Sequence, residues 1–289
     1  MKKIKGLIAN AIELSALGGE QLNSALWNLI MHSPRMPNRL HQLQLIEDAL
    51  TFEVKVDDSY FAKKQLSVKC FKWGNGPTKI LLTHGWGSKA LDFIELISLL
   101  RENKEYEIVA FDAPGNGESE GELTNLLLYV GAVKEIIKTV GEPAVLIGHS
   151  LGATTNMLIL KDSPVNKIQV LISLSPLIKL KEHFISIMNS VNSAEIDQLA
   201  FFESFQKKFN IRAEYFDLTS LYEKPSIPHL LAYDLTDKVS PYSFTKEFLS
   251  KNQNVIPYQV EGVGHEKMHR DPKILSEVKT FIEKNLGLA

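Results

Sequence analysis

The chain has 289 residues, of which 44% are hydrophobic and 23% charged, as is typical of a soluble globular protein with a large core. The 32 Lys and Arg residues nearly balance the 34 Asp and Glu residues, so the charge does not indicate a nucleic-acid or anionic-membrane partner. The single cysteine, Cys70, excludes a disulfide framework or a cysteine-based zinc site within one chain.

The first fifty residues are expected to form a helical extension. Residues 4–31 predict one or two helices broken at Gly18 and Gly19, and a further helix is predicted over 38–50 after a proline-containing linker. No stretch has the length and apolar character of a membrane span or a signal peptide. We therefore expect an amphipathic helix packed on the domain, no stable membrane insertion and a cytoplasmic location. Residues 1–40 carry more Lys and Arg than Asp and Glu, which also fits a weak contact with a membrane surface.

Strands are expected from residue 51 onward, and strands and helices alternate from residue 79. The strands are expected at 51–56, 66–73, 79–83, 107–111, 144–147, 168–174, 229–233 and 255–260, and the helices at 90–100, 123–140, 151–160, 241–249 and 272–286. Near-continuous apolar strands that alternate with helices predict an α/β fold with a parallel sheet covered on both faces. Ser240 and Asp271, each followed by proline, are expected to cap the last two helices.

The alternation stops between residues 177 and 225. This stretch is predicted to be helical and irregular, and it carries five phenylalanines, at 184, 201, 202, 205 and 209. An insertion between two strands of such a sheet commonly lies over the ligand crevice at their carboxyl ends. We therefore expect this segment to contribute to substrate selection.

The most informative motif is Gly148-His149-Ser150-Leu151-Gly152, a G-x-S-x-G sequence between an apolar strand and a helix. A tight turn of this kind lifts the serine hydroxyl above the sheet, and the glycines leave room for the neighbouring strand and helix. A serine hydroxyl is a poor nucleophile until a base removes its proton. The motif therefore predicts that Ser150 is a nucleophile with a histidine and a carboxylate later in the chain.

Both partners follow at the ends of later strands. Asp237 comes after the strand at 229–233, and His265 comes after the strand at 255–260. The order Ser, Asp, His is that of triads built on a nucleophile elbow. We expect His265 to take the serine proton and return it to the leaving group, while Asp237 holds the imidazole tautomer and stabilises the imidazolium.

Acyl transfer also needs backbone donors for the developing oxyanion. The N–H of Leu151, at the start of the helix after the serine, is one candidate. The other is the N–H of Trp86 in the loop His84-Gly85-Trp86-Gly87, which follows the strand at 79–83. Glycines on both sides of Trp86 let its backbone approach a substrate, and His84 is expected to shape the loop through local hydrogen bonds.

Two other motifs compete with this interpretation. His265-Glu266-Lys267-Met268-His269 is an H-E-x-x-H sequence, but the glycines before it and Asp271-Pro272 after it leave less than the two helical turns that a zinc site needs. Gly85 to Ala90 is a G-x-G-x-x-A sequence that partly matches a dinucleotide-binding loop. That interpretation leaves the serine elbow and the late Asp and His unexplained. We expect neither a metal nor an organic cofactor.

Five segments together resemble the α/β-hydrolase superfamily, in particular its bacterial members with a short N-terminal helical extension. These segments are His84-Gly85-Trp86-Gly87, residues 111–119 (FDAPGNGES), Gly148 to Ala153, residues 234–241 (DLTDKVSP) and residues 262–265 (GVGH). The resemblance spans about residues 70–285 and implies an α/β-hydrolase fold, with a mostly parallel eight-stranded sheet, helices on both faces and a small helical lid. It favours Asp237 over Asp234 as the triad acid, because Asp-Lys-Val-Ser-Pro fits the acid turn of the family. Asn116 departs from the histidine that is commoner at its position.

The expected organisation is an N-terminal extension (1–50), a hydrolase core (51–176 and 226–289) and a lid (177–225). The expected function is that of a carboxylesterase-like serine hydrolase, which cleaves an ester, thioester or amide bond of a small to medium, mostly apolar small molecule through an acyl-enzyme. Acyl transfer, lactonase and perhydrolase chemistry use the same triad and stay open, as does the oligomeric state. The alternative is a non-catalytic ligand-binding or sensing protein on the same fold.

Overall fold

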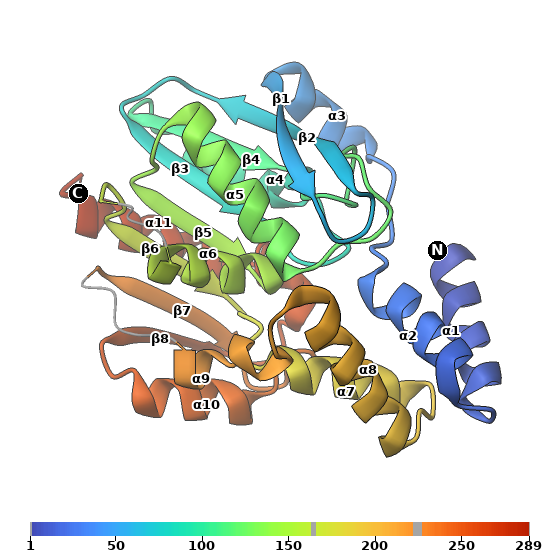
Figure 1. Ribbon diagram of the computed structural model, residues 1–289. Coiled ribbons are helices and arrows are strands. Elements are labelled where there is room, and N and C mark those ends of the chain that lie inside the picture. Colours follow the sequence, from blue (N-terminus) through green and yellow to red (C-terminus); the bar gives the residue numbers. More distant parts are fainter. Residues whose placement is uncertain (1, 163–165, 222–226, 289) are drawn as a thin grey trace.

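The computed structural model describes residues 2–162, 166–221 and 227–288, and its centre is an eight-stranded sheet (Figure 1). The strands are β1 (Leu50–Asp58), β2 (Lys64–Trp73), β3 (Thr78–Thr83), β4 (Tyr106–Phe111), β5 (Val145–His149), β6 (Val170–Leu174), β7 (His229–Asp234) and β8 (Val255–Val260), in the spatial order β1-β2-β4-β3-β5-β6-β7-β8. β2 runs antiparallel to β1 and β4, and the other pairs are parallel. The expected α/β-hydrolase fold is confirmed.

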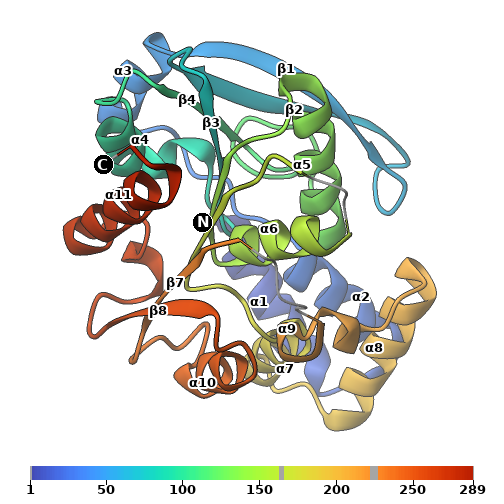
Figure 2. The ribbon, with the colours of Figure 1, turned by 90° about the vertical axis from the view of Figure 1, so that its left-hand side faces the viewer.

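Helices cover both faces of the sheet. They are α1 (Lys2–Ser15), α2 (Gly19–Met31), α3 (Leu40–Glu47), α4 (Ile94–Leu100), α5 (Leu126–Val140), α6 (Leu151–Asp162), α7 (Leu180–Ser190), α8 (Glu195–Phe209), α9 (Leu218–Leu221), α10 (Tyr242–Lys251) and α11 (Pro272–Leu286), with short 3₁₀ helices η1 (Ala90–Phe93), η2 (Ala213–Phe216) and η3 (His265–Lys267). Figure 2 shows α4 and α11 on one side of the strands and α5 and α6 on the other. The sheet therefore separates two apolar cores, one on each face.

The strand order places a crevice at the carboxyl ends of β3 and β5. β3 and β5 are neighbours, and the chain runs from β3 to β4 on one side of this pair and from β5 to β6 on the other. Such a switch point is where open α/β sheets bind ligands. Thr83 at the end of β3 pairs with Gly148 near the end of β5. The loop after β3 and the turn after β5 therefore begin side by side.

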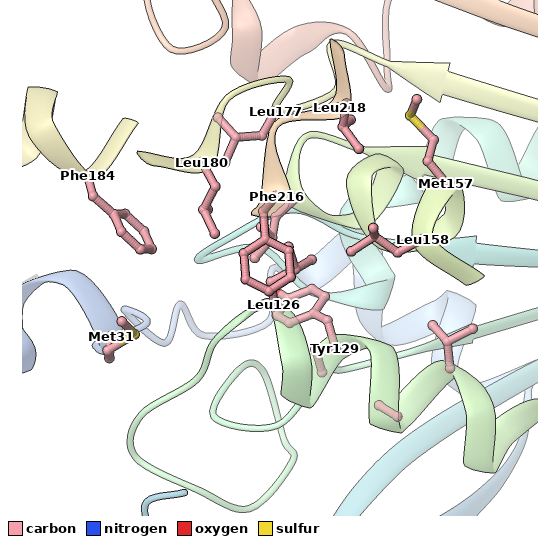
Figure 3. Packing of buried hydrophobic residues seen from close by; sticks show 14 of the residues in the cluster. Met31, Leu126, Tyr129, Met157, Leu158, Leu177, Leu180, Phe184, Phe216 and Leu218 are labelled. Atoms are coloured by element: carbon pink, nitrogen blue, oxygen red, sulfur yellow. The ribbon is translucent and has the colours of Figure 1, made fainter. Parts of the chain in front are cut away.

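The N-terminal extension is a helical hairpin, formed by α1 and α2, that packs against the lid helices α7 and α8. Trp27 of α2 contacts three phenylalanines of α8, namely Phe201, Phe205 and Phe209. Phe216 of η2 belongs to the same buried cluster and projects toward α5, as Figure 3 shows. The lid phenylalanines therefore serve mainly as the apolar interface between the lid, the hairpin and the sheet. The end of the expected lid (222–225) and the start of the next core segment (226) lie outside the described residues.

A strap of residues 32–39 connects this hairpin to α3 and crosses the loops at the carboxyl edge of the sheet. Arg35 donates from its guanidinium to the carbonyl oxygens of Gly115, Ser119 and Gly121. Lys89 donates from its ammonium to the carbonyl oxygens of residues 36 and 37 and to the side-chain oxygen of residue 38. These bonds fix the strap on the hydrolase core. Among the described helices, none is long and apolar enough to cross a membrane.

Three local expectations differ from the structure. α5 begins at Leu126, after an Asn125 cap, and its fully buried face includes Leu128 and Tyr129, whereas Leu127 and Val130 of the expected stripe are only half-buried. Ser240 does not cap the following helix, because Pro241 is itself the residue before the first turn and the Ser240 hydroxyl donates to the carbonyl of Pro176 instead. Asp271 does cap α11 as expected, accepting from the N–H groups of residues 273 and 274. α3 is also shorter than expected, with bounds Leu40–Glu47.

Candidate active site

Ser150 lies at a strained turn between β5 and α6. Its φ is +51°, a left-handed conformation that is uncommon for a residue with a side chain. A Cβ on Gly148 would come within 2.5 Å of the Ala153 backbone, and a Cβ on Gly152 would come within 2.1 Å of the carbonyl oxygen of Thr83. The two glycines of the motif are thus required by the close approach of the elbow to its own helix and to β3.

The structure brings Ser150, His265 and Asp237 together in one hydrogen-bonded chain. The Nε2 atom of His265 lies 2.9 Å from the Ser150 hydroxyl oxygen, and its Nδ1 atom lies 2.7 Å from an oxygen of Asp237. All three residues are buried. Since a carboxylate only accepts hydrogen bonds, the His265 proton lies on Nδ1 and Nε2 is left to accept the serine proton.

The two neighbouring aspartates occupy different environments. Asp237 also accepts from the N–H groups of Val239 and Ser240 at 2.8 and 2.9 Å. Burial acts to raise the pKa of Asp237, but the hydrogen bonds, first of all that from His265, leave the pKa below its ordinary value. Asp234 instead accepts from the N–H groups of Thr236, Gly262 and Gly264. Asp234 therefore shapes the turn that precedes His265 and does not contact the imidazole.

The loop after β3 lies against the nucleophile. A Cβ built on Gly85 would lie 3.0 Å from Cβ of Ser150, which is tighter than an ordinary contact, so the glycine eases this close approach. Trp86 follows Gly85 in this loop, and Leu151 is the first residue of α6. Both expected oxyanion donors are thus backbone groups next to Ser150. The Asp112 carboxylate holds the end of this loop by accepting from the N–H of Ala90, and it also accepts from the N–H of Glu118.

A cavity of about 310 Å³ opens beside Ser150 and His265. Its wall includes Met36, Pro37, Asn38, Arg39, His41, Gln42, Trp86, Gly87, Ser88, Lys89, Asp92, Ile94, Glu95, His149, Glu266, His269 and Arg270. None of the described lid residues belongs to this wall, which comes from the strap, α3, the loop after β3 and the segment after His265. Most of these side chains are polar or charged, whereas the apolar lid had suggested a mostly apolar substrate. Nothing in the sequence pattern connected residues 36–42 with the site.

The competing motifs do not adopt the geometry that their chemistry requires. The H-E-x-x-H segment forms only the short helix η3 and not the sustained helix that would place both histidines on one face. His265 instead faces Ser150, while the ring of His269 packs 4.8 Å from that of His149. No group of three or more potential metal ligands occurs in the described part of the chain. The loop from Gly85 to Ala90 lies against the nucleophile, with the place of a Gly85 Cβ only 3.0 Å from Cβ of Ser150.

A protein-family model matches the part of the chain that contains this site. Residues 80–277 match the model of the alpha/beta hydrolase family, which is more than half of the chain. The protein belongs to the alpha/beta hydrolase family. The matched region of this hydrolase contains the serine elbow, Asp237 and His265, and it leaves the N-terminal hairpin and the strap outside.

Two relatives of this hydrolase carry the names of hydrolases, one of them that of an esterase or lipase. A Mycoplasma genitalium protein named as an esterase or lipase is 25% identical over 242 residues, which cover 72% of this chain and 90% of the relative. A Bacillus subtilis hydrolase of uncharacterized activity is 34% identical over 86 residues, which cover 28% of this chain and 31% of that protein. These relatives support hydrolase activity.

Solved structures with the same fold include an esterase and a protein bound to ferulic acid. An esterase of Pyrococcus furiosus superposes with a TM-score of 0.62 at 19% identity, covering 88% of this chain and 98% of its own. A Butyrivibrio proteoclasticus protein solved with ferulic acid superposes with a TM-score of 0.60 at 16% identity, covering 80% of this chain and all of its own. At these identities the likeness establishes the fold.

Proposed function

We propose that this protein is a serine hydrolase that cleaves an ester bond through an acyl-enzyme. The observation that carries the proposal is the continuous hydrogen-bonded chain from the Ser150 hydroxyl through His265 to Asp237. In the first step the serine oxygen bonds to the carbonyl carbon, and its proton moves to Nε2 of His265. The carbonyl π electrons move onto the carbonyl oxygen, which accepts from the N–H groups of Trp86 and Leu151.

Collapse of the tetrahedral intermediate expels the alcohol, which takes its proton from Nε2 of His265. Water then attacks the acyl carbon and gives a proton to Nε2 of His265. Collapse of the second tetrahedral intermediate breaks the bond to the Ser150 oxygen, which takes this proton back as the acid leaves. An ester is the favoured substrate class because an alkoxide leaves more readily than an amine anion, so it makes the smaller demand on protonation by His265. Thioesters follow the same path.

The cavity supports a small to medium substrate that carries polar groups. A volume of about 310 Å³ accommodates a compact molecule. Its wall offers the imidazole of His41, the carboxylate of Glu266 and the guanidinium groups of Arg39 and Arg270. Burying apolar surface against such groups would remove water from them without replacing its hydrogen bonds. We therefore propose a polar ester in place of the mostly apolar one that the lid suggested.

Covalent labelling tests the nucleophile directly. The protein is treated with a fluorophosphonate probe, and the modified peptide is identified by mass spectrometry. We expect an adduct on Ser150 that is absent in Ser150→Ala and in His265→Ala, with both variants folded by circular dichroism. Labelling at another residue, or wild-type labelling in His265→Ala, would overturn the assignment.

Turnover separates a hydrolase from a binding protein on the same fold. We expect hydrolysis of short-chain p-nitrophenyl esters that is insensitive to a chelator and lost in Ser150→Ala. Binding of an ester without its hydrolysis by the wild-type protein would favour a ligand-binding function. Activity that disappears with a chelator and survives in Ser150→Ala would favour metal-dependent hydrolysis.

A further inference from the structure

The loop after β3, residues 84–89, has its polar backbone groups engaged on both sides of Trp86. The carbonyl oxygen of Gly85 accepts from the Tyr129 hydroxyl at 3.0 Å, from Nδ1 of His84 at 2.6 Å and from the N–H of Ser88 at 3.3 Å. The N–H of Gly87 donates to the side-chain oxygen of Asn116 at 3.2 Å. The N–H of Trp86 has no acceptor among the described residues. The Trp86 N–H is therefore available to a ligand.

The geometry of the peptide bond couples the Gly85 carbonyl to the Trp86 N–H. No cis peptide bond occurs in the described residues, and in a trans peptide the C=O and the N–H point in opposite directions. Tyr129 is fully buried on α5, so its hydroxyl draws the Gly85 carbonyl toward the protein interior. The Trp86 N–H is then turned the other way, at a loop that lies against Ser150.

The donors that hold the Gly85 carbonyl keep their protons. Nε2 of His84 accepts from the N–H of Ala113 at 2.9 Å, so the imidazole proton lies on Nδ1, where it donates to Gly85. Burial lowers the pKa of His84 to about 4, and this residue stays neutral near neutral pH. Burial raises the pKa of Tyr129 well above its ordinary value, so the hydroxyl stays protonated.

We propose that Tyr129 is a positioning residue of the oxyanion hole, whose hydroxyl fixes the Gly85–Trp86 peptide so that the Trp86 N–H faces the oxyanion. Without this hydroxyl, the peptide has more freedom to rotate and to turn its carbonyl toward the developing negative charge. The inference rests on the proposed serine hydrolase function. Tyr129 does not touch the substrate, and it acts only through the peptide bond that it holds.

The test compares Tyr129→Phe with a matched control, Tyr106→Phe. Tyr106 is a buried tyrosine at the amino end of β4, at the opposite edge of the sheet from Ser150. Each variant is assayed for kcat and KM with a short-chain p-nitrophenyl ester and for inhibition by a trifluoromethyl ketone, which forms a tetrahedral oxyanion on the serine. The ketone reports oxyanion stabilisation independently of the leaving group.

We expect Tyr129→Phe to lower kcat on the order of tenfold with KM changed by less than about twofold, because a complete oxyanion donor is worth about 10²–10³ and His84 still holds the carbonyl. Inhibition by the ketone should weaken by the same factor as kcat/KM. Tyr106→Phe should match the wild type in both measurements. A variant carrying 3-fluorotyrosine at position 129, which keeps the ring and the hydroxyl, should retain the wild-type kcat.

The inference is overturned if Tyr129→Phe keeps wild-type kcat and ketone inhibition, or if the fluorotyrosine variant loses as much activity as Tyr129→Phe. The second result would assign the effect to ring packing. A failure of the proposed function is distinguishable, because it would appear in the wild-type protein as an absence of both fluorophosphonate labelling and turnover.

Discussion

Trp27 in the N-terminal hairpin donates its indole N–H to the hydroxyl of Ser204 in α8 at 2.8 Å, across 177 residues of sequence. The same indole stacks on Phe205, with ring centroids 6.2 Å apart and an angle of 13° between the planes. A second polar contact joins the two elements where the N–H of Gly19 donates to Asp197 at 2.9 Å. The hairpin and the lid helices therefore form one packed unit above the sheet.

Removal of the Trp27 side chain should loosen this unit. We expect Trp27→Ala to lower the free energy of unfolding by about 3 kcal/mol, since it removes a large side chain from an aromatic cluster. Trp27→Phe keeps an aromatic ring and loses the indole N–H, so it should cost only about 1 kcal/mol. Urea unfolding followed by circular dichroism measures both. Equal stability of Trp27→Ala and the wild type would mean that the hairpin does not dock on the lid in solution.

The two aspartates of the acid turn should separate catalysis from stability. Asp237→Asn should lower kcat roughly 10³–10⁴-fold at nearly unchanged stability, because the amide cannot hold the productive imidazole tautomer. Asp234→Asn should lower kcat less than tenfold and cost about 1–2 kcal/mol of stability, since it weakens the bonds to the Gly262 and Gly264 N–H groups. Steady-state kinetics and urea unfolding of both variants make the comparison. The reverse pattern would assign the triad acid to Asp234.

Two glycines in helices should respond oppositely to alanine. A Cβ on Gly152 would lie 2.1 Å from the carbonyl oxygen of Thr83, so Gly152→Ala must push α6 away from β3 and should cost about 3 kcal/mol. A Cβ on Gly131, inside α5, would meet nothing closer than a methyl of Val56 at 3.6 Å. Gly131→Ala should therefore stabilise the protein by up to about 1 kcal/mol through helix propensity. Thermal unfolding of the pair checks both signs, and destabilisation by Gly131→Ala would contradict the packing described for α5.

Stability should fall as the pH drops below about 6.5. Burial lowers the pKa of His84 and His269 to about 4 and that of His229 to about 3, and burial with neighbouring histidines lowers that of His149 well below its ordinary value. Between these values and the unfolded pKa near 6.5, only the unfolded chain binds the protons, so each histidine removes up to about 1.4 kcal/mol per pH unit. Burial raises the pKa of Asp112 to about 6, so below this pH the folded protein binds one proton that the unfolded chain does not. This proton partly offsets the loss of stability that the histidines cause.

Urea unfolding between pH 7.5 and 5 measures this slope. His229→Gln, a change at the start of β7, should reduce the slope by about one proton. His41→Gln is the matched control, because it makes the same substitution at an exposed histidine. A slope that is unchanged in His229→Gln would show that this histidine already binds its proton in the folded protein.

Much of the core architecture follows from local patterns in the sequence. All eight strands were predicted within a few residues, because the first two show the alternation of half-buried strands and the others are short, largely apolar runs bounded by turns. The elbow at Ser150 could be recognised from five consecutive residues, because close backbone packing requires glycine at two of them. His265 and Asp237 were found from their order after later strands. The buried face of α5 was not predicted correctly. Apolar residues fill most of the first turn of this helix, and only the packing against β1 and α6 decides which of them are covered.

The sequence by itself determined the fold class, the strands and the residues that can supply nucleophile, base and acid, since these depend on short-range spacing and on backbone geometry. Only the tertiary structure decided that Asp237 and not Asp234 reaches His265, that the strap and not the described part of the expected lid lines the cavity, and that Tyr129 holds the Gly85 carbonyl. Each of these contacts joins segments whose relative placement depends on how the whole chain packs. The sequence around Tyr129 therefore cannot indicate that its hydroxyl binds a carbonyl group 44 residues away.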